Sequence, residues 1–254
     1  MQEWFAKIQE WFATIGEKFY DNFILDDKWQ YLTKGLAVTL KITFFAVIMG
    51  IAIGFLVAIV RASYDKTKSS RDAKSKASFG NIIFNIVNGI CKLYLTVIRG
   101  TPVVVQLMII YFVIFASVDV NKTVVACIAF GINSGAYVAE IVRSGIMSID
   151  NGQFEAGRSL GFNYPQTMVH IIMPQAFKNI LPALGNEFIV LLKETSVSGF
   201  IGLQDLTRGG DIIKSITYEP IMPLLAVALI YLVFVVIFQA LVNRLERRLR
   251  NRDH

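Results

Sequence analysis

Residues 155–174 read EAGRSLGFNYPQTMVHIIMP, a polar stretch punctuated by glycine that lies between two apolar blocks. Asp150 can cap a helix just before it, and Gly161 can end that helix in a left-handed conformation. The sequence therefore predicts a short helix over residues 151–160. A helix of this length gains most of its stability from packing, so we expect it to contact another surface.

A second helix is predicted directly afterwards, capped by Asn163 and ended by Pro174. In the first helix, Phe154 and Leu160 are candidate apolar contacts, while small residues would allow a partner to approach the backbone. The alternative is a helical hairpin that only connects two spans. The residues expected at a partner contact are Phe154, Glu155, Ala156, Gly157, Leu160, Gly161, Ile171 and Pro174.

The composition indicates a protein that crosses a membrane several times. Of 254 residues, 54% are hydrophobic and 17% charged, with a mean hydropathy of +0.53. Soluble domains carry about 25% charged residues. The net charge of +6 does not indicate a nucleic-acid partner, because basic residues concentrate at 61–76 and 244–252, each beside an apolar segment. That arrangement is typical of cytoplasmic membrane flanks.

Five segments are long and apolar enough for an all-α polytopic protein. We expect spans at 35–60, 101–117, 122–146, 183–203 and 221–242. Segment 79–98 is expected to be an elbow or interfacial helix, because it carries several asparagines. The basic flanks place the N-terminus outside, the C-terminus inside and the 147–182 loop in the cytoplasm.

The N-terminus contains an internal repeat, since QEWFAKI at 2–8 recurs at 9–15 with one change. It predicts an amphipathic helix that anchors residues 1–28 at the membrane interface. A coiled-coil seam is the alternative, but two heptads are too few to support it. The expected organisation is this extension, a membrane domain over 29–245 with a cytoplasmic loop at about 148–182, and a basic tail over 246–254.

Enzyme signatures are missing from the sequence. It has no GxxxxGK[ST], GxGxxG, HExxH or GxSxG motif, so ATP would have to bind to another subunit. Cys91 and Cys127 are isolated and the histidines lie far apart, so we expect no metal or redox site and no cofactor bound by this chain.

The spacing within 155–174 resembles the EAA loop of ABC importer permeases. That loop is written Glu-Ala-Ala, three residues, Gly, nine residues, Ile-x-Leu-Pro. Gly161 and Ile171 match its spacing, whereas Gly157 replaces the second alanine and Met173 replaces leucine. Both replacements remain small or apolar.

The resemblance extends over residues 35–245. The Arg99–Pro102 stretch with Gln106, and the stretches 135–143, 181–188 and 192–196, look like the polar amino acid branch, which resembles histidine, glutamine, arginine and cystine permeases. This implies a type I ABC importer transmembrane domain in a bacterial inner membrane. The implied partners are ABC ATPase subunits carrying ATP and Mg, an extracytoplasmic amino-acid-binding protein, a second permease subunit and an amino acid substrate.

Polar residues within the spans are candidates for a substrate path, because burying them in lipid is costly. Asn133, Tyr137 and Glu140 share one helix face with Ser144. Glu140 could face a substrate ammonium group or pair with Arg143, and both alternatives stay open.

In the fourth span, Thr195 and Ser196 precede two glycines where the helix could open towards a cavity. Lys193 and Glu194 are expected to form a buried pair.

Gly50 and Gly54 of the first span are expected to serve helix packing. Two other classes remain as alternatives: a secondary transporter coupled through Glu140 and Glu194, and a structural membrane subunit.

Overall fold

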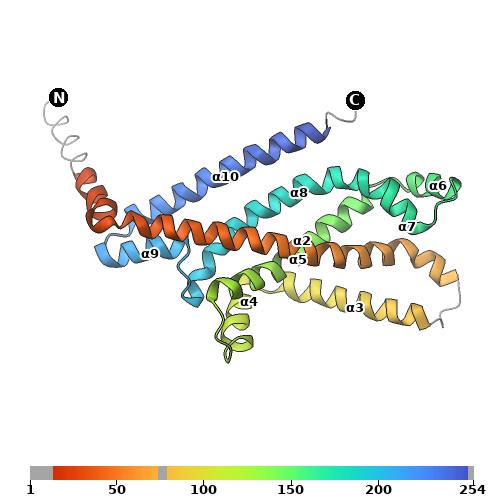
Figure 1. Cartoon of the computed structure of the whole chain (residues 1–254), viewed down its shortest axis with the longest axis horizontal. Helices are drawn as coiled ribbons and strands as arrows, with labels where there is room; N and C mark the ends of the chain where they lie inside the picture. The colour runs from red at the N-terminus through yellow and green to blue at the C-terminus, as the bar shows by residue number, and fades with distance from the viewer. Residues whose placement is uncertain (1–13, 74–78, 251–254) are drawn as a thin grey trace.

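The computed structural model describes residues 14–73 and 79–250, which are built from helices and connecting turns. The helices run roughly along one long direction (Figure 1). Helix α9 lies at the end next to the N-terminal segment, and α6 and α7 lie at the opposite end. These two ends are called the α9 end and the α6 end below.

The longest helix is α2 (Trp29–Ala73), which packs closely on α5 (Lys122–Met147). Two glycines allow this approach. A Cβ atom added at Gly50 would lie 2.8 Å from Oγ of Ser134, and one at Gly54 would lie 2.5 Å from Cγ1 of Val138. The predicted packing role of both glycines is confirmed.

Helix α3 (Phe79–Gly100) corrects the predicted spans, because residues 79–98 form a helix apolar and long enough to cross a membrane, not an elbow. The predicted span 101–117 is wrong. Pro102 interrupts the chain there, and only short helices follow, α4 (Val103–Ile109) and η3 (Ile110–Ile114).

The loop at the α6 end contains α6 (Asn151–Ser159), α7 (Tyr164–Thr167) and η4 (Met168–Ile172), followed directly by α8 (Met173–Glu194). The prediction that Pro174 ends the second helix is wrong. Pro174 occupies the first turn of α8, where no backbone N–H is needed. The predicted span 183–203 therefore begins too late, and its last third is the 3-10 helix η5 (Thr195–Ile201).

At the α9 end, α9 (Leu206–Thr217) lies against the first turns of α2. The two backbones nearly touch, since a Cβ atom at Gly35 would lie 2.5 Å from the carbonyl oxygen of Asp205. Helix α10 (Ile221–Arg250) then returns along the molecule.

The N-terminal segment meets α2 through η1 (Tyr20–Ile24) and η2 (Leu25–Asp27). Most of the predicted amphipathic repeat lies in residues 1–13, outside the described residues. The buried ammonium of Lys28 donates to the carbonyls of Asp21 and Leu25, both at 3.1 Å. These bonds stabilise the bend before α2.

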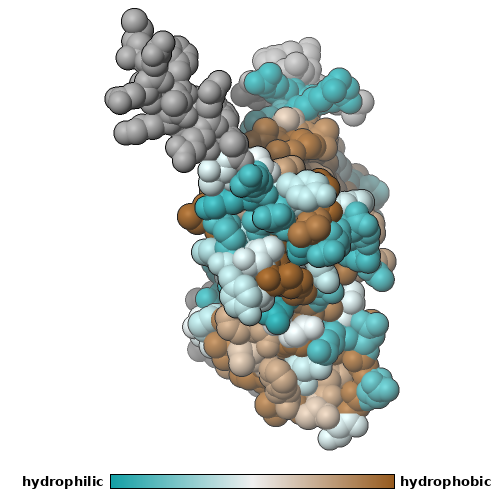
Figure 2. All heavy atoms as spheres, turned by 90° about the vertical axis from the view of Figure 1, so that its left-hand side faces the viewer, coloured by the Kyte–Doolittle hydropathy of each residue, from teal (hydrophilic) through white to brown (hydrophobic). Residues whose placement is uncertain are grey.

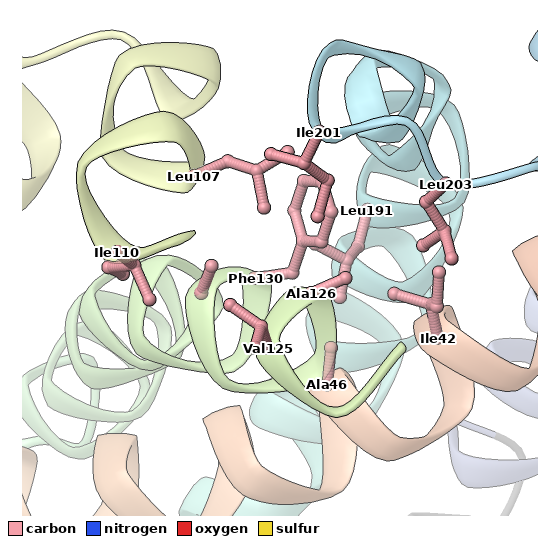
Figure 3. Close-up of a cluster of buried hydrophobic side chains, with 11 residues drawn as sticks. Ile42, Ala46, Leu107, Ile110, Val125, Ala126, Phe130, Leu191, Ile201 and Leu203 are labelled. Carbon is pink, nitrogen blue, oxygen red and sulfur yellow. The ribbon is translucent and has the colours of Figure 1, made fainter. Parts of the chain in front are cut away.

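Within the described residues, four helices are long and apolar enough to cross a membrane: α2 over Trp29–Asp65, α3, α5 and α10. Helix α8 has 22 residues and lies between them. A buried apolar cluster joins α5 and α8 to the short helices. In Figure 3, Leu107 of α4, Phe130 of α5, Leu191 of α8 and Ile201 of η5 point towards one another.

Candidate translocation cavity and docking loop

A cavity of about 490 Å³ lies between the end of α3, the second half of α5 and α8. It is lined by both charged and small polar side chains. These include Arg99, Tyr137, Glu140, Ser144, Asn179 and Glu187. Charged side chains at membrane depth face a protein interior or a water-filled space, and this cavity supplies one.

Glu140 is the centre of an ion-pair network on one side of the cavity. Its carboxylate accepts a hydrogen bond from Arg143, one turn further along α5. Nη1 of Arg99 lies 3.7 Å from the same carboxylate. Arg143 also lies 3.6 Å from Asp65 of α2. The network therefore joins α2, α3 and α5.

Two further contacts shape the cavity. The guanidinium carbon of Arg99 lies 5.7 Å from the centre of the Tyr137 ring, within cation–π range. Glu187 is only 8% exposed, and its carboxylate accepts a hydrogen bond of 2.8 Å from Ser134. The cavity thus presents a guanidinium and two carboxylates, which together complement a molecule carrying both charges.

The predicted polar stripe of α5 is only partly in this cavity. Tyr137 and Glu140 line it, and the pairing of Glu140 with Arg143 is confirmed. Asn133 is buried elsewhere, where its amide donates to the side-chain oxygen of Gln106 at 3.0 Å. Gln106 in turn donates to the carbonyl of Ile98 at 2.7 Å. These bonds hold α4 against α5 and the end of α3.

Thr195 and Ser196 lie away from this cavity. Thr195 is fully buried and donates to the carbonyl of Leu192 at 2.8 Å. The chain changes from α-helical to the tighter 3-10 geometry at Thr195 and leaves it at Gly202 with φ of +68°, so the helix does not open at Thr195 as predicted. Lys193 is exposed, so it does not form the buried pair predicted with Glu194.

Ser196 lines a different cavity of about 340 Å³ at the α9 end, together with Arg208 and Asp211. The carboxylate of Asp211 binds both Arg208 and Lys214. Its pKa is lowered, first by the hydrogen bond from Lys214. The surface at this end carries hydrophilic residues across its middle and hydrophobic ones towards its lower edge (Figure 2).

Four polar residues of the cavity are absent from the predicted stripe and site: Arg99, Ser148, Asn179 and Glu187. Asn179, Ala183 and Glu187 follow one another at intervals of four on α8, so they share one face of the helix. That spacing was the available signal. Arg99 can be recognised as a cavity residue only when the end of α3 is known to lie beside α5.

Helix α6 forms nearly as predicted. The side chain of Asp150 accepts a hydrogen bond of 2.6 Å from the amide of Gly152, and Gly161 follows the helix with φ of +84°. The amide of Phe162 donates to the carbonyl of Gly157 at 3.0 Å, which closes the end of the helix.

The faces of α6 differ from the prediction. Phe154 is 8% exposed, and its ring stacks on Tyr164 with centroids 6.4 Å apart. Gly157 is buried because its neighbour is Thr167, whose Cγ2 would lie 2.6 Å from an added Cβ. Their roles are internal packing. Leu160 is 71% exposed, and Glu155 and Ala156 are also exposed.

The segment after α6 holds it in place. Asn163 caps α7 as predicted and forms a capping box with Gln166, at 3.0 Å and 2.9 Å. Ile171 packs on the buried cluster that contains Phe154. Burial raises the pKa of Tyr164. The loop is thus a folded unit with its own apolar interior.

Two side-chain bonds join this loop to α8. Gln175 donates to the side chain of Gln153 at 3.3 Å, and Asn179 donates to Ser148 at 3.0 Å. Ser148 and Asn179 both line the cavity, so the second bond lies in the cavity wall. Among the residues that the structure describes, no group of three histidines, cysteines or acids could hold a metal ion.

Comparison with known proteins gives consistent matches. The family described as "Binding-protein-dependent transport system inner membrane component" matches residues 77–251. The chain is 37% identical over 225 residues to the arginine transport system permease protein ArtQ of Bacillus subtilis, covering 88% of this chain and 94% of ArtQ. It is 35% identical over 222 residues to the glutamine transport system permease protein GlnP of Escherichia coli K12, covering 86% and 93%.

Two solved structures match the fold, and one of them also matches the sequence. A crystal structure of an amino acid ABC transporter with histidines has a TM-score of 0.75 and 40% identity, covering 89% of this chain and 98% of that chain. An inward-facing structure of the MetNI methionine ABC transporter has a TM-score of 0.71 at 20% identity, covering 87% and 97%. The second likeness concerns the fold alone.

Proposed function

The chain belongs to the family of binding-protein-dependent transport system inner membrane components, and on that premise we propose that it imports polar amino acids. It is a permease subunit of an ABC importer and not an enzyme. The observation that carries the substrate class is the cavity between α3, α5 and α8, which presents both signs of charge. Arginine and glutamine permeases among its relatives support the same class.

The cavity residues would bind the two charged groups that every amino acid carries. Arg99 would receive the α-carboxylate; its guanidinium is partly exposed beside the Tyr137 ring, which supports this role. Glu140 and Glu187 would receive the ammonium group. A volume of about 490 Å³ lies within the range of roughly 300–1,000 Å³ common for small-molecule sites.

The exposed face of α6 would dock on the ATPase, which carries ATP and Mg. Glu155, Ala156 and Leu160 form this face, and Gly161 sets the turn after it. Phe154, Gly157, Ile171 and Pro174 support it from inside. ATP-driven closure of two ATPase subunits would move α6, and its bond from Gln153 to Gln175 would carry that movement to α8, which bears Asn179 in the cavity.

The remaining partners follow from an orientation with the N-terminus outside and the C-terminus in the cytoplasm. Five spans, α2, α3, α5, α8 and α10, give this arrangement with the α6 loop and the basic residues 61–76 on the cytoplasmic side. An extracytoplasmic amino-acid-binding protein would then deliver substrate at the α9 end. A second permease subunit, identical or different, would complete the pathway in the inner membrane.

The test uses the permease reconstituted with its ATPase and its binding protein in proteoliposomes. Leu160→Asp places a charge on the docking face, and Val118→Asp places the same charge on an exposed valine in the turn before α5. We expect Leu160→Asp to lose ATPase association and ATP-dependent uptake while Val118→Asp keeps both. ATPase association retained in Leu160→Asp, or uptake indifferent to ATP depletion, would contradict the proposal.

The substrate class is tested separately with a panel of labelled amino acids. Arg99→Gln removes the proposed carboxylate partner but leaves Glu140 paired with Arg143. We expect uptake of all amino acids to fall while ATPase association is unchanged. Unchanged uptake in this variant would show that the cavity does not receive the carboxylate.

A further inference from the structure

An apolar cavity lies at the α6 end, separate from the translocation cavity. Its volume is about 430 Å³. The wall combines the last turns of two spans with the segment after α6. Its apolar members include Ile59 and Ala62 of α2, Ile146 of α5, and Met168 and Val169 of η4. Tyr164 also lines it, and this residue stacks on Phe154 of α6.

The depth of this space in the membrane follows from the helices around it. On α2 the uncharged apolar sequence between Lys41 and Arg61 ends one residue after Ile59, and α5 ends at Met147. The wall residues therefore lie where the hydrocarbon meets the interface. Ile59 and Val169 are 50% and 60% exposed, so the rim is apolar and open to its surroundings. A lipid acyl chain is the apolar group available at this depth.

Positive charge follows the cavity wall along the sequence. Helix α2 continues beyond Ile59 and Ala62 to Ala73. Residues 61–78 contain six basic residues and two acids. One of those acids, Asp65, is already paired with Arg143. The uncompensated charge favours an anionic headgroup at this level of the membrane.

We propose that the cavity holds one acyl chain of an anionic phospholipid, with the phosphate beside the basic stretch 61–76, which follows the cavity wall in the sequence and includes Lys66. The unbranched chain fills an apolar space that water would occupy unfavourably. Each basic residue near the headgroup strengthens binding about fivefold. The bound lipid would support Tyr164, and through it the stacked Phe154 of α6.

The test uses tryptophan quenching in the full-length protein, in phosphatidylcholine nanodiscs containing brominated lipid. Val169→Trp places a reporter at the rim, and the signal of the parent protein is subtracted. We expect brominated phosphatidylglycerol to quench the reporter at about fivefold lower mole fraction than brominated phosphatidylcholine. Lys66→Gln should remove this preference, and Lys34→Gln, an exposed lysine at the other end of α2, should keep it.

Three outcomes would overturn the proposal. Equal quenching by both lipids would show that the cavity has no preference for an anionic headgroup. No quenching by either lipid would show that no acyl chain enters the cavity, provided that Trp29 at the α9 end is quenched and the thermal midpoint equals that of the parent. Quenching that appears only when oligomers dissociate would assign the space to a second copy of the chain.

Discussion

Replacement of Gly54 by alanine will weaken the packing of α2 on α5. A Cβ atom there would lie 2.5 Å from Cγ1 of Val138 and 2.8 Å from the backbone nitrogen of Ala139. Relief requires one helix to move away from the other, and overpacking of this kind costs about 1–3 kcal/mol. Gly89 on α3 is the matched control, because a Cβ atom there meets nothing within 4 Å.

Both variants exchange glycine for alanine inside a helix, so a propensity gain of about 1 kcal/mol cancels in their difference. The Gly54→Ala protein should therefore unfold roughly 2–12 °C below the Gly89→Ala protein, at about 2–4 °C per kcal/mol for a chain of this size. Thermal unfolding in detergent, followed by tryptophan fluorescence, measures this. Equal midpoints would refute the reasoning, because the α5 backbone would then have yielded without cost.

Three further outcomes are expected. Burial raises the pKa of Asp205 to about 6, so the contribution of this group to stability is fully present below about pH 4 and is lost as the pH rises to about 6; Asp205→Asn, which still caps α9, should remove this part of the pH dependence and raise the free energy of unfolding near pH 7 by roughly 3 kcal/mol. An unchanged slope would contradict this. Gly161→Val should lower the thermal midpoint because its φ is +84°, at a cost of about 1–2 kcal/mol, whereas Gly161→Asn should be tolerated; equal effects would exclude backbone strain. Ser134→Ala leaves the Glu187 carboxylate without its partner and should destabilise by about 1–3 kcal/mol, against no change for the exposed Ser215→Ala.

The docking loop was the most predictable part of the molecule. Its start, its cap at Asn163 and its turn at Gly161 depend on local backbone requirements that a few residues reveal. The face that α6 presents was not predictable in the same way. Phe154 and Leu160 are both apolar, and only the position of Tyr164 decides which of them is buried.

The sequence misplaces the second span because the asparagines of residues 79–98 indicate an interfacial helix. Asn88 of α3 is buried and accepts a hydrogen bond of 2.8 Å from Arg61, and Tyr94 donates to the carbonyl of Ile132 at 2.6 Å. Such partners come from neighbouring helices, which a single segment does not reveal. Pro174 is ambiguous for a related reason. A proline breaks the interior of a helix but fits the first turn of one, and Pro174 lies in the first turn of α8.

The cavity depended on long-range placement. Glu140 and Arg143 are one turn apart, and their pairing was one of two alternatives that the sequence left open. Arg99 reaches them from a helix whose end was not expected there. The family membership meanwhile decides against a secondary transporter and against a purely structural subunit.

The length of helix α2 has a consequence for how movement could pass through the molecule. The 45 residues of this helix make an unbroken rod about 67 Å long, more than twice the thickness of a hydrocarbon core of roughly 30 Å. One end is held against the start of α9 at Gly35, and the other is joined to the last turns of α5, just before the loop, through the ion pair of Asp65 with Arg143. A tilt of about 5° around its midpoint would move each tip by about 3 Å. Small rotations of this one rod would therefore reach both faces of the membrane at once, in opposite directions.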